Sequence, residues 1–181
     1  MSTRNIAQYG LLTSAMLVLG LVERQFVIVP GVPGIRLGLS NIVLLYALVL
    51  ISASGAWLLM VLKVLLGGFL YAGVTGLFYS LAGGVLSMLA MQLVLRVRGV
   101  GMVGISVAGA AAHMLGQLAV SRWLLGSWSA LAQAPILLVA AVVTGVLTGV
   151  VAQVVCRAMA KTDPKMQERL RELGLAGEER P

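Results

Sequence analysis

Residues 135–156 read PILLVAAVVTGVLTGVVAQVVC, a run of 22 residues that contains no Asp, Glu, Lys, Arg or His. An α-helix needs about 20 mostly apolar residues to cross the hydrocarbon core of a bilayer. This run therefore predicts a transmembrane helix. Further apolar segments precede it in the chain, at 6–22, 37–52, 56–72, 74–95 and 101–120. We expect an all-α integral membrane bundle of about six transmembrane helices.

The composition of the whole chain supports a membrane protein. Of its 181 residues, 60% are hydrophobic and 10% are charged, whereas soluble domains carry about 25% charged residues. The mean hydropathy is +1.01. The net charge of +7 does not indicate nucleic-acid binding, because the Lys and Arg residues lie at helix ends and in the tail rather than among stacking aromatics.

The distribution of basic residues predicts the orientation, since cytoplasmic loops are rich in Lys and Arg. Six crossings leave three arginines on one side, Arg24, Arg36 and Arg122. They put a larger set on the other side: Arg4, Arg96, Arg98, Arg157, Lys161 and Lys165. We therefore expect a multi-pass protein of the inner (cytoplasmic) membrane with both termini in the cytoplasm.

The chain divides into two parts, a membrane domain at 1–160 and a cytoplasmic segment at 161–181. In the second part, Asp163 and Pro164 suit the N-cap and first position of a helix. Met166, Leu170 and Leu173 then form an apolar stripe. This short amphipathic helix could lie on the membrane, dock a partner or be solvated, and residues 177–181 are expected to be disordered.

Sequence motifs for catalysis do not fit this chain. Residues 99–104 match the dinucleotide fingerprint, but no acid lies between Glu23 and Asp163 to bind a ribose. There is no P-loop, and one Asp and one His cannot supply the carboxylates of prenyl transfer or a multi-histidine metal site. We expect no enzyme, no cofactor and no bound metal. The one cysteine, Cys156, cannot form an internal disulfide.

Small residues recur every four positions in the last two apolar segments. The two stripes are Gly104, Ala108, Ala112 and Gly116, and then Ala141, Gly145 and Gly149. Small residues let membrane helices approach closely, so we interpret both stripes as packing seams. Packing within the bundle is the expectation, and packing against a partner subunit is the alternative.

Polar side chains inside the apolar segments are the candidates for function, because they are costly in a bilayer. The candidates are Asn41, Lys63, Tyr71, Tyr79, His113 and Gln117. All except Lys63 fall in the outer half of the bilayer in the expected topology, which is typical of a pocket open to the extracytoplasmic side. Bonding between neighbouring helices, worth about 0.6 kcal/mol each, is an equally good reading of the amides and the histidine.

Lys63 lies near mid-membrane, with no acid in a neighbouring segment to pair with. It could be neutral, bonded to carbonyls, or reserved for an anionic ligand.

Four stretches of the chain together resemble one family. They are PGVPGIRLGLSNIV at 30–43, KVLLGG at 63–68, FYSLAGG at 78–84 and HMLGQ at 113–117. The family is labelled heptaprenyl diphosphate synthase component I, or Gx transporter, and the likeness covers roughly 6–155. The chain departs from the family pattern at Lys63, where Arg is expected, and at Met114, where Asn is expected.

The family in turn resembles the substrate-binding S components of energy-coupling-factor (ECF) vitamin transporters. This resemblance implies a six-helix bundle with a ligand site near the outer surface, covered by the loop from Pro30 to Arg36. The leading hypothesis is a membrane subunit that captures a small vitamin-like or isoprenoid-like molecule, with Arg36 or Lys63 on an anionic group. Its partners would be the ligand, membrane lipids, and an ECF-type energising module unless transport is solitary.

A second hypothesis is a non-catalytic assembly subunit that anchors a prenyl-synthase or redox partner through its glycine seams and basic tail.

Overall fold

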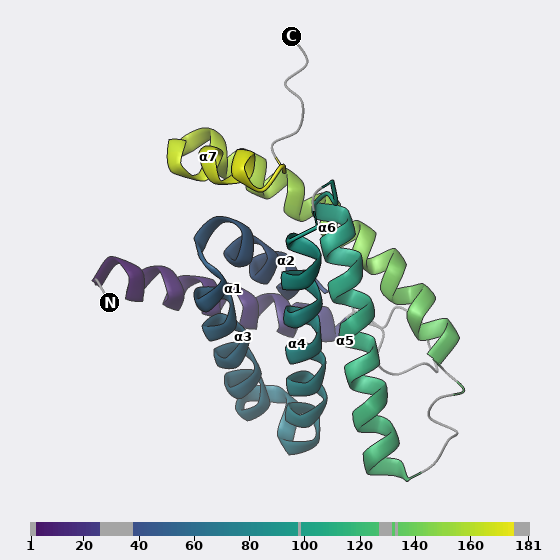
Figure 1. The fold of residues 1–181 in the computed structure, drawn as a ribbon. Helices are drawn as coiled ribbons and strands as arrows, with labels where there is room; N and C mark the ends of the chain where they lie inside the picture. The colour runs from purple at the N-terminus through teal and green to yellow at the C-terminus, as the bar shows by residue number, and fades with distance from the viewer. Residues whose placement is uncertain (1–2, 26–37, 98, 127–131, 133, 176–181) are drawn as a thin grey trace.

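The computed structural model describes residues 3–25, 38–97, 99–126, 132 and 134–175, and the regular structure in these ranges is helical (Figure 1). The elements in chain order are α1 (Thr3–Gln25), α2 (Leu39–Tyr46), the π-helical turn η1 (Ala47–Ile51), α3 (Ala53–Gly67), the π-helical turn η2 (Gly68–Ala72), α4 (Gly73–Leu95), α5 (Met102–Leu125), α6 (Ala134–Thr162) and α7 (Pro164–Glu172). The expected all-α fold is confirmed, with all six apolar segments in helices.

Within the described residues, four stretches are long and apolar enough to cross a membrane: Asn5–Gln25, Ala53–Leu95, Met102–Leu124 and Ala134–Thr162. The 43-residue stretch Ala53–Leu95 reverses direction at Gly73, whose φ of +67° favours glycine. It therefore folds into two neighbouring segments, α3 with η2 and then α4 (Figure 1). The remaining apolar helix, Leu39–Ile51, is shorter.

The helices close into a ring. α1 packs on α2 and α3, and α3 packs on α4. α4 packs on α5, α5 on α6, and α6 on α2, which completes the ring (Figure 1). Two hydrogen bonds bring the end of α1, the start of α2 and the η2 turn together at one end of the bundle: Glu23 to Leu39 and Arg24 to Tyr71.

The boundary between the second and third segments differs from the expectation. The sequence predicts that the third helix begins at residue 56, after Ser52–Gly55, but α3 begins at Ala53. Ser52 is extended, and its side-chain oxygen accepts the backbone N–H of Gly55 at 3.0 Å. One capping residue therefore makes the whole connection, and the glycine lies inside the helix.

The amphipathic helix after the membrane segments is present as α7. The Asp163 side chain accepts the N–H of Lys165 at 2.9 Å and Pro164 is the first residue, which confirms both sequence predictions. The apolar stripe packs on the chain's own bundle, since Leu170 is 3% exposed and belongs to the main core. Arg169 Nε also donates to the backbone oxygen of Val49 in η1 at 2.7 Å. Residues 177–181 lie outside the described residues.

The glycine seam of α6 packs inside the bundle. A Cβ at Gly145 would lie 2.8 Å from Val107 Cα, and one at Gly149 would lie 2.7 Å from Val103 Cα. Gly116 of α5 lies against the backbone of Ala82 in α4 instead. At Gly104 a Cβ would meet Val100 of the preceding turn and no other described residue within 4 Å, so this position is not part of a seam between helices.

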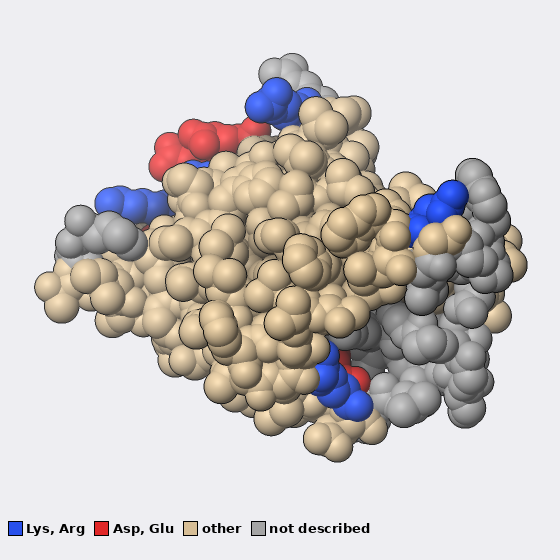
Figure 2. All heavy atoms as spheres, turned by 90° about the horizontal axis from the view of Figure 1, so that it is seen from below, with Lys and Arg blue, Asp and Glu red and all other residues tan. Residues whose placement is uncertain are grey.

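The outside of the bundle is apolar, as a lipid-facing surface requires. Phe69, at the α3–α4 reversal, is 85% exposed, and Val74 is 74% exposed. Figure 2 shows a face covered mostly by uncharged side chains, with charged ones in a few separate places.

Candidate functional site

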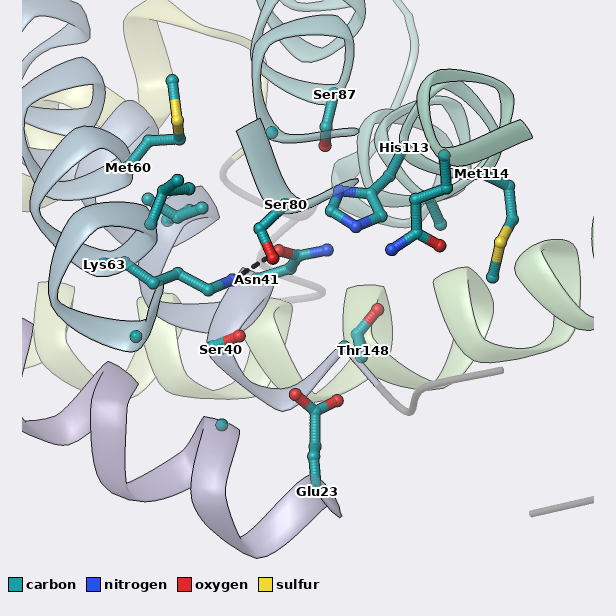
Figure 3. Close-up of a pocket in the computed structure, with 18 of the residues that line it drawn as sticks. Glu23, Ser40, Asn41, Met60, Lys63, Ser80, Ser87, His113, Met114 and Thr148 are labelled. Atoms are coloured by element: carbon teal, nitrogen blue, oxygen red, sulfur yellow. Dashed lines mark hydrogen bonds between the residues drawn. The ribbon is translucent and has the colours of Figure 1, made fainter. Parts of the chain in front are cut away.

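A pocket lies inside the ring of helices, and each of the six apolar segments contributes to its wall (Figure 3). The cavity measures about 80 Å³. This is room for several water molecules or one compact organic molecule. The polar residues of the wall are Glu23, Ser40, Asn41, Lys63, Tyr71, Ser80, Ser87, His113, Gln117, Thr144 and Thr148.

The structure places five of the seven predicted site residues in this one wall: Asn41, Lys63, Tyr71, His113 and Gln117. Lys63 Nζ donates to Asn41 Oδ1 at 3.5 Å, which joins α3 to α2 across the cavity (Figure 3). Residues from four separate elements thus converge, as a shared pocket requires. That these side chains bind a ligand stays a prediction.

The other two candidates are not in the described wall. Tyr79 lies outside the lining residues, and its hydroxyl donates to Ser121 Oγ at 3.1 Å. It bonds α4 to α5, which is the structural alternative considered for polar residues in membrane helices. Arg36, together with the loop from Pro30, lies outside the described residues.

His113 is held closely against α4. A Cβ at Gly83 would lie 2.8 Å from His113 Cε1, so glycine at that position makes room for the imidazole ring. Gln117 follows one helical turn later on α5 and is 9% exposed. Positions four residues apart share a helix face, and both side chains line the cavity as their spacing predicts.

Tyr71 is positioned by its neighbours on α1 and α3. A Cβ added at Gly20 would lie 2.8 Å from the Tyr71 hydroxyl oxygen, and one added at Gly67 would lie 3.0 Å from it. Glycine at both positions therefore makes room for the tyrosine. The Arg24 guanidinium lies over its ring, with Cζ 4.7 Å from the ring centroid. Two glycines and one arginine therefore fix this ring at the edge of the pocket.

Glu23 is the main residue that the sequence prediction missed. α1 extends to Gln25, beyond the predicted end at residue 22, and carries Glu23 into the pocket wall at 5% exposure. Its Oε1 accepts the N–H of Leu39 at 2.9 Å, at the start of α2. The expectation that no segment neighbouring Lys63 holds an acid is therefore wrong, because α1 carries Glu23 into the wall of the same pocket.

Small hydroxyl residues also line the cavity and were not predicted. On α4, Ser80 and Ser87 share one helix face, and on α6 Thr144 and Thr148 do the same. Such a spacing of small polar residues on one face was the signal that could have found them.

The hydroxyl of Ser87 stands out within this set. The residue is 2% exposed, and its Oγ has no hydrogen-bond partner among the described residues. A buried hydroxyl without a partner costs about 1–3 kcal/mol. A polar group in the cavity would remove this cost.

The wall is suited to holding a polar molecule. It offers the side chains of one glutamate, one lysine, one histidine, two amides and several hydroxyl residues, which together donate and accept hydrogen bonds in many directions. No group of three or more His, Cys, Asp or Glu that could hold a metal ion occurs in the part of the chain that the structure describes.

Comparison with known families gives one match. Residues 12–155 match the model of the family described as heptaprenyl diphosphate synthase component I. No curated protein and no solved structure matches the chain. The family match spans every residue that lines the pocket. The chain therefore belongs to the heptaprenyl diphosphate synthase component I family.

Proposed function

We propose that this protein is a membrane substrate-binding subunit that captures a small molecule from the extracytoplasmic side for transport. The observation that carries the proposal is the pocket, which takes polar side chains from each of the helices α1 to α6. A polar cavity in a membrane bundle is costly unless a polar molecule occupies it.

The polar wall favours a vitamin-like ligand over an isoprenoid-like one. An isoprenoid chain cannot satisfy the charges of Glu23 and Lys63 or the hydroxyl of Ser87. A compact molecule with several hydrogen-bonding groups can. Of the two ligand classes expected from the sequence, we therefore favour the vitamin-like one.

The position of the pocket supports entry from the outer side. Glu23, Asn41 and Tyr71 lie near the end of the bundle where α1 ends and α2 begins. In the orientation that the basic residues predict, this end is extracytoplasmic and the termini are cytoplasmic, in the inner membrane. Labelling of single cysteines at residues 3, 99 and 126 with a membrane-impermeant thiol reagent in intact cells tests the orientation. Residue 126 should be labelled, and labelling of residue 99 instead would contradict the orientation.

Energy for transport would come from a partner. A transporter of this kind needs either an energising module with ATPase activity or a solitary mechanism, and the chain has no P-loop. Uptake of the labelled ligand that depends on a co-expressed ATPase module supports the first. Equal uptake without the module supports the second.

Native mass spectrometry of the gently purified protein tests ligand capture directly. We expect a retained small molecule in the wild type and its loss in His113→Ala and Lys63→Ala. Tyr79→Phe is the matched control, because Tyr79 bonds Ser121 outside the pocket wall, and it should retain the molecule. A wild-type protein that is always empty would contradict the proposal.

The family description favours a second candidate, a non-catalytic subunit that anchors a synthase partner, since it names a component of a synthase. The α6 glycines cannot serve as its docking seam, because they pack on α5 within the chain. The exposed basic residues of α7 remain available, such as Lys165 and Arg171. Under this reading, Lys165→Glu with Arg171→Glu abolishes co-purification of the synthase subunit, while His113→Ala has no effect.

A further inference from the structure

The two charged side chains of the pocket wall have opposite sign and come from different helices. Glu23 reaches the cavity from α1, and Lys63 reaches it from α3. Figure 3 shows both side chains directed toward the cavity. The wall therefore presents a negative and a positive group at separate places around one small volume.

Glu23 accepts one hydrogen bond within the fold and can still accept hydrogen bonds from a ligand. Its Oε1 accepts the N–H of Leu39 and so serves the start of α2. This bond needs one acceptor oxygen, whereas a carboxylate has two, each with more than one acceptor position. At 5% exposure the carboxylate is shielded from water, so a positively charged group nearby is strongly favoured.

A ligand with one charge fits this wall poorly. A ligand anion is attracted by Lys63 but repelled by the Glu23 carboxylate in the same cavity. A ligand cation is attracted by Glu23 but repelled by Lys63. A molecule that carries an amine and an acidic group gains from both, through charge-assisted hydrogen bonds. The cavity of about 80 Å³ limits such a molecule to a compact one.

From this arrangement we propose that the ligand class is a compact zwitterion, with its amine at Glu23 and its carboxylate or phosphate at Lys63. The inference rests on the proposed function and extends the anionic ligand that is one sequence-based reading of Lys63. Ser87 and His113, on α4 and α5, supply neutral polar contacts to the remainder of the molecule.

The test compares probes matched in length and different in charge: β-alanine and γ-aminobutyrate, propionate and butyrate, and propylamine and butylamine. Binding is measured on the detergent-purified full chain by ligand-dependent thermal shift and by native mass spectrometry. We expect an amino acid to bind about ten-fold or more tighter than the acid and the amine of its length. Equal affinity of butyrate and γ-aminobutyrate would overturn the proposal.

Two variants test which side chain binds the amine of the ligand and which binds its acidic group. Glu23→Gln keeps an acceptor oxygen for Leu39, and it should reduce γ-aminobutyrate binding to the level of butyrate. Lys63→Met should reduce it to the level of butylamine. Glu168→Gln, an exposed acid on α7, is the control and should change nothing. A preference for the amino acid that survives Glu23→Gln would overturn the assignment.

Failure of this inference can be distinguished from failure of the proposed function. If the wild type retains a small molecule that His113→Ala loses, and that molecule has no amine, the ligand class is wrong and the binding function stands. If no molecule is retained and no probe binds, both are wrong.

Discussion

The guanidinium of Arg24 clamps Tyr71 at two points: its Nη1 donates to the Tyr71 backbone oxygen at 2.8 Å, and its Cζ lies 4.7 Å from the centre of the ring. Tyr71 belongs to η2, the last turn before the reversal at Gly73, where backbone oxygens lack partners within the helix. The end of α1 therefore holds the end of α3 in place beside the pocket.

Arg24→Ala should lower the free energy of unfolding by about 1 kcal/mol, because it removes an exposed charged hydrogen bond and a cation–π contact. Arg24→Lys should be intermediate, since an ammonium lacks the planar fork. Thermal unfolding in detergent measures the effect. Arg96→Ala, an exposed arginine at the end of α4, is the control, and an equal loss there would contradict the clamp.

Gly83→Ala should weaken ligand binding about ten-fold although it removes no polar group. The added Cβ would lie 2.8 Å from His113 Cε1, so the imidazole must move. The affinity for the retained molecule measures the effect, and Tyr79→Phe on the same helix is the control. Unchanged affinity in Gly83→Ala would mean that the position of His113 does not matter.

Ser87→Ala should have opposite effects on stability and binding. Removing a buried hydroxyl that has no partner among the described residues should stabilise the empty protein by about 1 kcal/mol and lower its affinity for ligand. Ser14→Ala controls for helix propensity, because Ser14 is exposed on α1. A loss of both stability and affinity would show instead that the hydroxyl serves the fold.

Gly149→Ala should destabilise the bundle by about 1–3 kcal/mol, since its Cβ would lie 2.7 Å from Val103 Cα and force α5 and α6 apart. Gly10→Ala is the matched change on α1, where nothing lies within 4 Å, and it should be neutral or mildly stabilising. Unfolding midpoints in detergent separate the two. Equal midpoints would contradict close packing at this seam.

Leu170→Ala should release α7 from the bundle. The side chain is 3% exposed in the core, and truncation of such a leucine costs about 2–5 kcal/mol. Faster hydrogen exchange of the α7 amides, with the membrane helices unchanged, is the expected readout. Glu168→Ala, at an exposed position, should leave α7 protected.

Hydropathy was sufficient to predict the helical segments, because a bilayer leaves no other way to satisfy the backbone of a long apolar run. It did not fix their ends. Ser52–Gly55 looks like a loop by composition, yet Ser52 alone caps α3. Likewise Glu23 looks like a helix terminus, but α1 continues to Gln25 and buries it. Ends depend on capping partners in other parts of the fold, such as Leu39, that local sequence does not reveal.

The candidate site was predictable where side chains are costly in lipid. Lys63, His113 and Gln117 are noticed for that reason, and the structure brings them into one wall. Tyr79 does not line the cavity, because neighbouring positions on a helix point in different directions: Ser80 lines the cavity, whereas Tyr79 bonds Ser121. Serine and threonine hardly lower the hydropathy of a segment, so Ser87 and Thr148 gave no signal of that kind.

The docking of α7 on η1 has a consequence for biogenesis. Arg169 reaches the backbone oxygen of Val49, 120 residues earlier in the chain. Ribosomes make the second membrane segment long before α7, so its π-helical turn must wait through the insertion of four more segments before this contact can form. A helix late in the chain thus covers a turn that belongs to one of the early segments. A chain truncated before α7 would keep its apolar helices but leave that early turn uncovered.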